Sequence, residues 1–209
     1  MRGEDGDGRQ GIGTTGHSLP NYEKVEYEKI MDMKRLYLID CQNDFCSKGG
    51  ALSNKEAINT VKNIVDILST VHFDEVVCTM DTHYKETYKD SLEGQTVPEH
   101  CIKGTWGWKL NEYIVEALNN LPEKVRKTFH SIHKDSYMAD PETMRKECES
   151  LKEGDEVVVC GFCTDICVIN NALLIQRLVN DRNINVDIIE DCCAGSTPEK
   201  HQMAIELLK

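Results

Sequence analysis

The sequence is poor in positive charge and has no long apolar segment. Its 24 lysine and arginine residues stand against 36 aspartates and glutamates, which gives a formal net charge of −12. Such a surface repels phosphate backbones and anionic lipid, so it argues against nucleic-acid and membrane partners. No apolar run approaches the roughly 20 residues of a membrane span, and the first residues contain no apolar segment of a secretory signal. We therefore expect a cytoplasmic protein.

Ten cysteines are many for a chain of 209 residues. They would indicate a disulfide framework in a small secreted domain, but this chain is large and carries the apolar pattern of a full core. Several of them stand inside apolar runs, such as Cys78 in EVVCTM and Cys160 in EVVVCG. A thiol in such a run acts as a small apolar group, so we expect reduced cysteines.

The chain divides into an irregular beginning and a regular remainder. Residues 1–33 are rich in glycine and polar side chains, so we expect a disordered extension there and one folded domain over 34–209. Strands are predicted at 35–41, 75–80, 127–134, 156–161 and 185–191, and helices at 54–71, 109–119, 141–151, 168–179 and from 198 onward. This alternation predicts a doubly wound α/β domain, with a parallel sheet between helices on both faces.

Four reactive side chains stand at the predicted strand ends, where such a fold binds its ligands. Asp40 and Asp81 end the first two strands. Lys134 ends the third strand, and Cys167 begins the helix after the fourth. The free N–H groups of a helix N-terminus favour a thiolate, so Cys167 is a candidate nucleophile. Asp40 could take the thiol proton and return it to a leaving amine, while Lys134 could orient this acid or balance its charge.

A second group of polar side chains indicates a metal site. Asp81 and His83 form an Asp-x-His pair at a strand end, and Glu93 and His100 stand in the segment that follows. Carboxylate and imidazole ligands suit zinc, iron or manganese. We therefore expect one divalent metal ion as a cofactor.

Three cysteines offer an alternative. Cys160, Cys163 and Cys167 have the C-x2-C-x3-C spacing that can hold a metal ion or an iron–sulfur cluster. Cys160 falls inside a predicted strand, however, and no fourth ligand stands at a matching spacing. A non-catalytic, cysteine-rich redox or metal-binding protein stays open as a further hypothesis.

Taken together, the motifs resemble those of the isochorismatase-like cysteine hydrolases, and of nicotinamidases most of all. The segments LIDCQNDF, DTH, PEHCIKGTWGW, HKDSY and GFCTDICV carry the resemblance, which runs from about residue 35 to the end. It implies a three-layer sandwich and an enzyme that hydrolyses an amide carbon–nitrogen bond through a thioester. It assigns catalysis to Asp40, Lys134 and Cys167, and metal binding to Asp81, His83, Glu93 and His100.

The resemblance also implies a cis peptide bond before Cys163, and an oxyanion hole formed by the backbone N–H groups of Cys163 and Cys167. Nicotinamidases usually place an aromatic residue shortly before the metal histidine, and this chain has Val97 there. We therefore expect a differently shaped pocket around Val97, with these aromatic candidates to line it: Phe45, Tyr88, Trp106, Tyr137 and Phe162.

The first functional hypothesis is therefore hydrolysis of nicotinamide to nicotinate and ammonia. The alternative within enzymes is hydrolysis of another small amide, carbamoyl or ureido compound, and a catalytically silent member of the family is a third hypothesis. By analogy with relatives we also expect a homo-oligomer.

Overall fold

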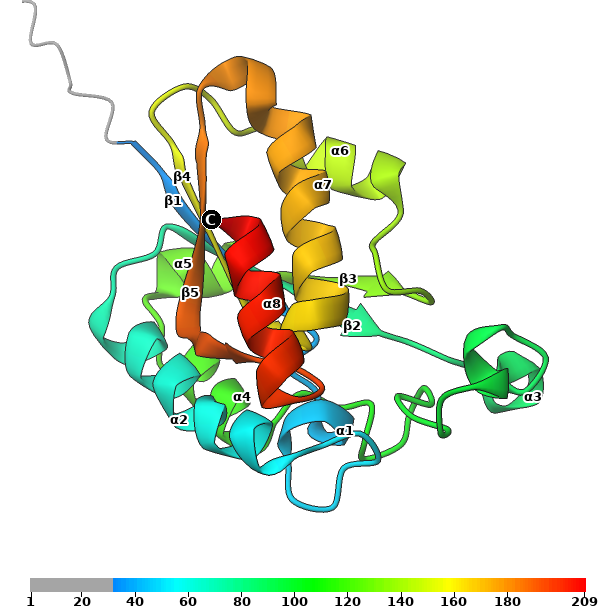
Figure 1. The fold of residues 1–209 in the computed structure, drawn as a ribbon. Helices are drawn as coiled ribbons and strands as arrows, with labels where there is room; N and C mark the ends of the chain where they lie inside the picture. Colours follow the sequence, from blue (N-terminus) through cyan, green and yellow to red (C-terminus); the bar gives the residue numbers. More distant parts are fainter. Residues whose placement is uncertain (1–31) are drawn as a thin grey trace, which may run out of the picture. The chain divides into compact units, whose positions relative to one another are not determined.

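The computed structural model describes residues 32–209, so the predicted disordered extension over 1–33 lies almost wholly outside the described residues. Five strands form one parallel sheet in the order β3-β2-β1-β4-β5. The chain runs outward from the central β1 to β2 and β3, then crosses to the other side of β1 for β4 and β5 (Figure 1). The predicted doubly wound α/β class is confirmed. The strands span Lys34–Ile39 (β1), Glu75–Asp81 (β2), His130–Lys134 (β3), Glu156–Phe162 (β4) and Asn185–Ala194 (β5).

Helices cover both faces of the sheet. Helices α2 and α4 pack together on one face, and α6, α7 and α8 pack on the other (Figure 1). Between residues 32 and 209, no helix has both the length and the hydrophobicity that crossing a membrane requires. The α-helices span Asn43–Cys46 (α1), Lys55–Thr70 (α2), Lys85–Tyr88 (α3), Glu112–Asn119 (α4), Glu123–Thr128 (α5), Pro141–Cys148 (α6), Ile169–Val179 (α7) and Pro198–Leu208 (α8). Three short turns are Glu93–Gln95 (η1), Thr164–Val168 (η2) and Asn180–Arg182 (η3).

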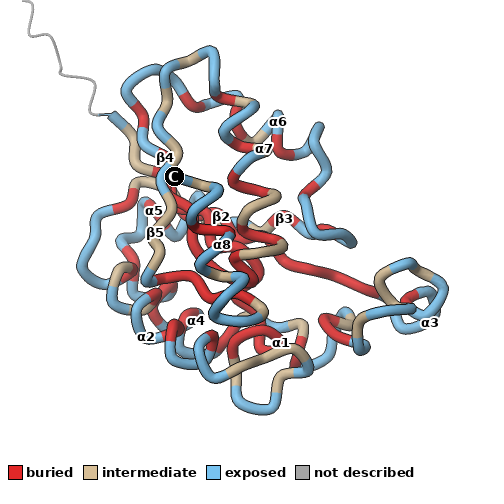
Figure 2. The backbone as a smooth tube through the Cα atoms, in the orientation of Figure 1, coloured by how far each residue is buried: buried red, intermediate tan, exposed pale blue. Residues whose placement is uncertain are grey.

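The core lies in the sheet and on the inner sides of the helices, whose outer sides are exposed (Figure 2). Residues 35–39 of the central strand are all buried, as expected for a parallel strand that is covered on both faces. Leu38 stands opposite Cys78 on β2 and Cys160 on β4. All ten cysteines are free and buried, which agrees with the prediction of reduced core thiols.

Several element boundaries differ from the prediction, and some short helices were not predicted. The strand predicted over 127–134 begins only at His130, because residues 123–128 form α5, which begins after Pro122 and buries Val125. The one-turn helix α1 was not predicted at all. Its first amides donate to the distant carbonyls of Lys109 and Gly107, at 2.9 and 3.0 Å. A turn held by residues more than 60 positions away carries no local periodic signal.

A buried arginine lies at the end of the sheet where the parallel strands begin. The side chain of Arg35 on β1 is 2% exposed, and its Nε donates to Glu75 Oε2 at 2.8 Å. Its Nη1 donates to the carbonyl of Glu147 and its Nη2 to Ser150 Oγ, each at 2.7 Å. The guanidinium is thus hydrogen-bonded on every side within the core.

We expect Arg35→Met to lower the free energy of unfolding by roughly 2–3 kcal/mol, because it leaves Glu75 unpaired and removes hydrogen bonds to buried acceptors. Urea denaturation followed by circular dichroism measures this loss. The matched control is Lys34→Met, since the Lys34–Glu156 ion pair is solvent-exposed and contributes at most about 1 kcal/mol. Equal losses in the two variants would contradict a stabilising role for the buried network.

Candidate active site

The carboxyl ends of β1, β2 and β3 bring three of the predicted side chains together beside the nucleophile candidate. The Nζ atom of Lys134 lies 2.7 Å from Asp40 Oδ2 and 3.4 Å from Asp81 Oδ1. The same Nζ lies 3.6 Å from the sulfur of Cys167. All four residues are buried, with at most 5% of any of them exposed. The structure therefore gathers, in one cluster, the four reactive residues that the sequence placed at strand ends.

The two carboxylate oxygens of Asp40 have different partners. It follows β1 with a positive φ of 48°, and its backbone N–H donates to Thr79 at 3.2 Å. The hydroxyl of Thr79 donates to Oδ1 at 2.7 Å. Oδ2 faces Lys134 in the ion pair but accepts no aligned hydrogen bond. One oxygen is thus anchored, and the other keeps a lone pair that can accept a proton.

Cys167 lies on η2, a π-helical turn between β4 and α7. Side chains from other segments hold this turn. Asp165 accepts from the backbone N–H and the hydroxyl of Ser196, at 2.7 and 2.6 Å, and the Asn171 side chain donates to the carbonyl of Cys167 at 2.7 Å. The peptide bond that leads into the turn, Phe162–Cys163, is cis, as the resemblance implies. The turn therefore presents the sulfur from a fixed backbone.

Burial and neighbouring charges set the protonation of this cluster. Burial raises the pKa of the Cys167 thiol well above its usual value, although Lys134 lowers it. Burial also raises the pKa of Asp40, and Lys134 offsets part of that rise. Burial lowers the pKa of Lys134, but Asp40, Cys167 and Asp81 outweigh it and leave this pKa raised. The resting cluster is therefore a neutral thiol beside an Asp40–Lys134 ion pair.

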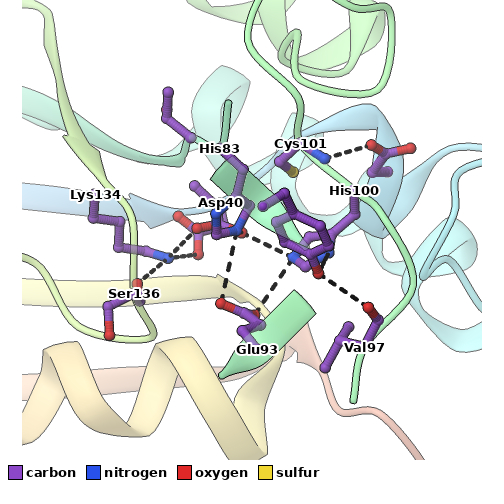
Figure 3. Close-up of polar contacts among 12 residues, drawn as sticks. Asp40, His83, Glu93, Val97, His100, Cys101, Lys134 and Ser136 are labelled. Carbon is purple, nitrogen blue, oxygen red and sulfur yellow. Dashed lines mark hydrogen bonds and ion pairs between the residues drawn. The ribbon is translucent and has the colours of Figure 1, made fainter. Parts of the chain in front are cut away.

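The predicted metal ligands also converge. The Nε2 atoms of His83 and His100 each lie 3.0 Å from Asp81 Oδ2, and the carboxylate of Glu93 lies 3.7 and 3.6 Å from them (Figure 3). One donor atom from each of the four residues lies within 4.8 Å of all the others. Two carboxylates and two imidazoles thus converge in one site, and burial and the charge of Asp81 raise the pKa of Glu93. The donor set fits zinc, iron or manganese.

The cysteine alternative finds no support in this geometry. Between residues 32 and 209, the four-residue group around Asp81 is the only one whose histidine, cysteine or acidic donors converge. Cys160 is fully buried within β4, and Cys163 and Cys167 do not join it in a cluster of ligands. The C-x2-C-x3-C spacing is therefore not a metal site in this fold.

Two residues that the sequence did not single out hold the metal ligands in place. The Gln42 side chain accepts a hydrogen bond from the backbone N–H of Asp81 at 2.7 Å and donates one to the carbonyl of Asp81 at 2.7 Å. Asp44 accepts the N–H of Cys101 at 2.7 Å, and the carbonyl of Cys101 accepts the N–H of His83 at 3.0 Å. The run of polar residues after the apolar strand in LIDCQNDF could have indicated these two residues. Polar side chains beside a buried strand need hydrogen-bond partners, and these can come from other segments.

A cavity of about 380 Å³ opens beside Cys167 and the metal group. Of the predicted pocket residues, Phe45, Val97 and Tyr137 line it. Phe162 does not, because β4 continues through Phe162 and pairs it with Ala194, which leaves its side chain fully buried in the core. The pocket role predicted for Phe162 is therefore wrong.

The other two aromatic candidates also lie away from the cavity wall. Trp106 is 53% exposed on the surface, and Tyr88 is buried against the metal-site histidines. Five further lining residues were not predicted from the sequence. They come from the segments that precede α2 and α8 and from η2: Leu52, Ser53, Asn54, Ile166 and Ser196.

The parallel sheet, with a thiol, a carboxylate and an ammonium group buried at its edge, places the chain among isochorismatase-like α/β hydrolases. The chain belongs to the isochorismatase domain family, whose model matches residues 35–209.

Similar proteins include several nicotinamidases. The chain is 28% identical over 192 residues to the nicotinamidase of Escherichia coli (strain K12), covering 79% of this chain and 84% of that protein. It is 25% identical over 179 residues to the nicotinamidase of Saccharomyces cerevisiae, covering 70% and 82%. The solved pyrazinamidase/nicotinamidase of Streptococcus mutans UA159 superposes with a TM-score of 0.68 at 26% identity, covering 84% of this chain and 94% of that one. The resemblance inferred from the motifs is confirmed.

Proposed function

We propose that this chain converts nicotinamide into nicotinate and ammonia through a thioester on Cys167. One observation carries the proposal: the Cys167 sulfur lies 3.6 Å from Lys134 Nζ, which lies 2.7 Å from Asp40 Oδ2, beside a cavity of about 380 Å³. The nicotinamidases among its relatives support the choice of substrate.

The first step moves the thiol proton. Because the Cys167 thiol is neutral at rest, the sulfur becomes nucleophilic as Asp40 Oδ2 accepts its proton. The sulfur then attacks the amide carbonyl carbon, and Lys134 keeps the charge of the cluster balanced. The negative oxygen that forms is held by the backbone N–H groups of Cys163 and Cys167.

The second step releases ammonia and then the acid. The protonated Asp40 returns the proton to the leaving nitrogen, the carbon–nitrogen bond breaks, and the acyl group stays on sulfur as a thioester. Asp40 next removes a proton from a water molecule, whose oxygen attacks the thioester carbon and displaces the thiolate, which is reprotonated. The sum is amide plus water giving carboxylate plus ammonium.

The metal group lies at one side of the same cavity, which Asp81, Glu93 and His100 help to line. These three residues and His83 would hold a divalent ion. When bound, the ion would supply a Lewis-acid site for an electron pair of the substrate, such as that of a pyridine nitrogen. The four side chains would thereby orient the amide toward Cys167.

An ammonia-release screen on metal-replete protein tests the proposal. Nicotinamide, pyrazinamide, benzamide and a set of carbamoyl and ureido compounds are compared at equal concentration, and the nicotinate product is identified by chromatography. We expect nicotinamide among the best substrates. Ammonia release from other compounds but not from nicotinamide would overturn the choice of substrate while leaving the amidase chemistry.

One observation favours the second candidate, hydrolysis of another small amide, carbamoyl or ureido compound. Val97 lines the cavity where an aromatic side chain was expected from the resemblance, and Phe162 contributes nothing to its wall. The wall is thus less suited to stacking on a flat ring. The same screen decides between the two candidates. A homo-oligomer in the cytoplasm stays a prediction.

We expect a single divalent ion per chain, and we expect His83→Ala to weaken its binding by about 100-fold or more, because one of four converging donors is lost. Competition with a chromophoric chelator measures the affinity, and elemental analysis gives the stoichiometry. The matched control is His72→Ala, since the His72 side chain is 75% exposed and lies outside the group. Equal affinity in the two variants would refute the assignment of the ligands.

A further inference from the structure

We propose that Tyr88 is the positioning residue of the metal site, which fixes the ring of His100 and spaces it from that of His83. The inference rests on the proposed function, in which these histidines hold a divalent ion. Tyr88 is no ligand itself. It ends the one-turn helix α3 in the segment between β2 and Glu93, and only 3% of it is exposed.

The hydroxyl of Tyr88 lies behind the imidazole of His100. Its oxygen is 3.1 Å from His100 Nδ1, 3.1 Å from the carbonyl of Val97 and 3.0 Å from that of Pro98. The Pro98 carbonyl is also 2.8 Å from His100 Nδ1. A carbonyl can only accept, so Nδ1 carries the hydrogen, and the lone pair for an ion lies on Nε2. The hydroxyl has one hydrogen, so it donates to one of the two carbonyls, while its oxygen lies within accepting distance of the Nδ1–H; it thereby links the ring to the chain before His100.

The phenol ring of Tyr88 fills the corner between the two imidazoles. Its centroid lies 4.8 Å from that of His83 and 5.6 Å from that of His100, with edge-to-face angles of 63° and 88°. The two imidazoles are 4.9 Å apart at 70° to each other. Edge-to-face contacts of this kind are favourable beyond the area that they bury, and a smaller side chain would free both rings to turn.

The backbone of Tyr88 reaches the third ligand segment. Its carbonyl accepts from the N–H and the hydroxyl of Ser91, at 3.0 and 2.6 Å, and Ser91 Oγ accepts from the N–H of Gly94 at 2.9 Å. A Cβ at Gly94 would collide with the Tyr88 carbonyl, so the backbone next to Glu93 packs directly against the backbone of Tyr88. Tyr88 therefore contacts three of the four ligand-bearing segments, those of His83, Glu93 and His100.

Two substitutions separate the hydroxyl from the ring. Tyr88→Phe removes only the hydroxyl, and we expect it to weaken Zn²⁺ binding by about 10- to 100-fold, the usual effect of losing a hydrogen-bond partner of a metal ligand. Tyr88→Leu also removes the ring, and we expect a greater loss and an altered visible absorption spectrum of the Co²⁺-substituted protein. Chelator competition gives the affinities. The control is Tyr84→Phe, because Tyr84 stands in the same segment but is 51% exposed, and we expect less than a twofold change there.

The outcomes are distinguishable. Wild-type affinity in Tyr88→Phe and Tyr88→Leu, with an unchanged Co²⁺ spectrum, would overturn the role of Tyr88 and leave the metal site standing. Failure of the wild-type protein to bind Zn²⁺ or Co²⁺ would overturn both the metal site and this inference, whereas the ammonia-release screen tests the amidase proposal separately. If Tyr88→Leu does not fold, the affinity of Tyr88→Phe relative to Tyr84→Phe decides the question alone.

Discussion

Replacing Cys167 by alanine should abolish amide hydrolysis, with kcat falling by roughly 10⁴-fold or more. The sulfur would be the atom that bonds to the substrate, so no other group of the cluster can take its place. Asp40 and Lys134 remain as a paired acid and base in this variant, because they lie 2.7 Å apart independently of the sulfur. The variant should therefore fold, and loss of turnover can be assigned to chemistry.

The matched control is Cys192→Ala. Cys192 is 1% exposed on β5 and lies outside the residues that line the cavity, so its loss tests the general effect of removing a buried thiol. We expect the activity of this variant to stay within about twofold of wild type. Acid quenching of the wild-type protein during turnover, followed by mass spectrometry, should find the acyl group of the substrate on the peptide that contains Cys167. Retained turnover in Cys167→Ala would eliminate the thioester mechanism.

Replacing Asp40 by asparagine should lower kcat by about 10³- to 10⁴-fold, because the group that would move the proton in both half-reactions is lost. The same change should lower the free energy of unfolding by roughly 3 kcal/mol. It leaves the buried Lys134 ammonium with the longer ion pair to Asp81 and the hydrogen bond to the Ser136 carbonyl at 2.9 Å, but without its nearest carboxylate. Steady-state kinetics and urea denaturation measure the two effects on one protein preparation.

A double variant separates catalysis from stability. Burial raises the pKa of Asp40, which disfavours its charged form. The pKa of Lys134 is raised by its acidic neighbours and Cys167, which favours its charged form. Burying both charges costs free energy that their mutual attraction largely offsets, so we expect the pair to contribute little net stability. We expect Asp40→Asn/Lys134→Met to regain most of the stability lost in Asp40→Asn and to stay inactive. A double variant as unstable as Asp40→Asn would contradict this expectation and would show that the ion pair itself stabilises the fold.

The sequence predicted the main elements of this fold well because their signals are local. The 16 residues of α2 repeat apolar side chains at helical spacing. The sequence also places a good capping residue before them, since the side chain of Asn54 accepts the N–H of Ala57 at 2.8 Å. Short apolar runs alternating with helices predicted a parallel sheet. Parallel strands bring their carboxyl ends to one edge, so side chains at strand ends were expected to meet.

The sequence was less informative where distant contacts decide the structure. Phe162 was expected in the pocket as one of the aromatic candidates, but pairing with Ala194 on β5 extends β4 and buries it. Helix α1 likewise depends on carbonyls of residues 107 and 109. Gln42, Asp44 and Tyr88 act through hydrogen bonds and ring contacts to segments that folding alone brings near.

By itself, the sequence determined the class of fold, the reactive side chains and their order along the strands. Apolar periodicity and the position of a residue at the end of a strand can both be recognised from a few consecutive residues. The tertiary structure alone decided which oxygen of Asp40 faces Lys134 and which accepts from Thr79, how His83 and His100 face Asp81, and which side chains shape the cavity. Those features depend on how the side chains of separate segments are placed against one another in the folded chain, and no local pattern encodes that placement.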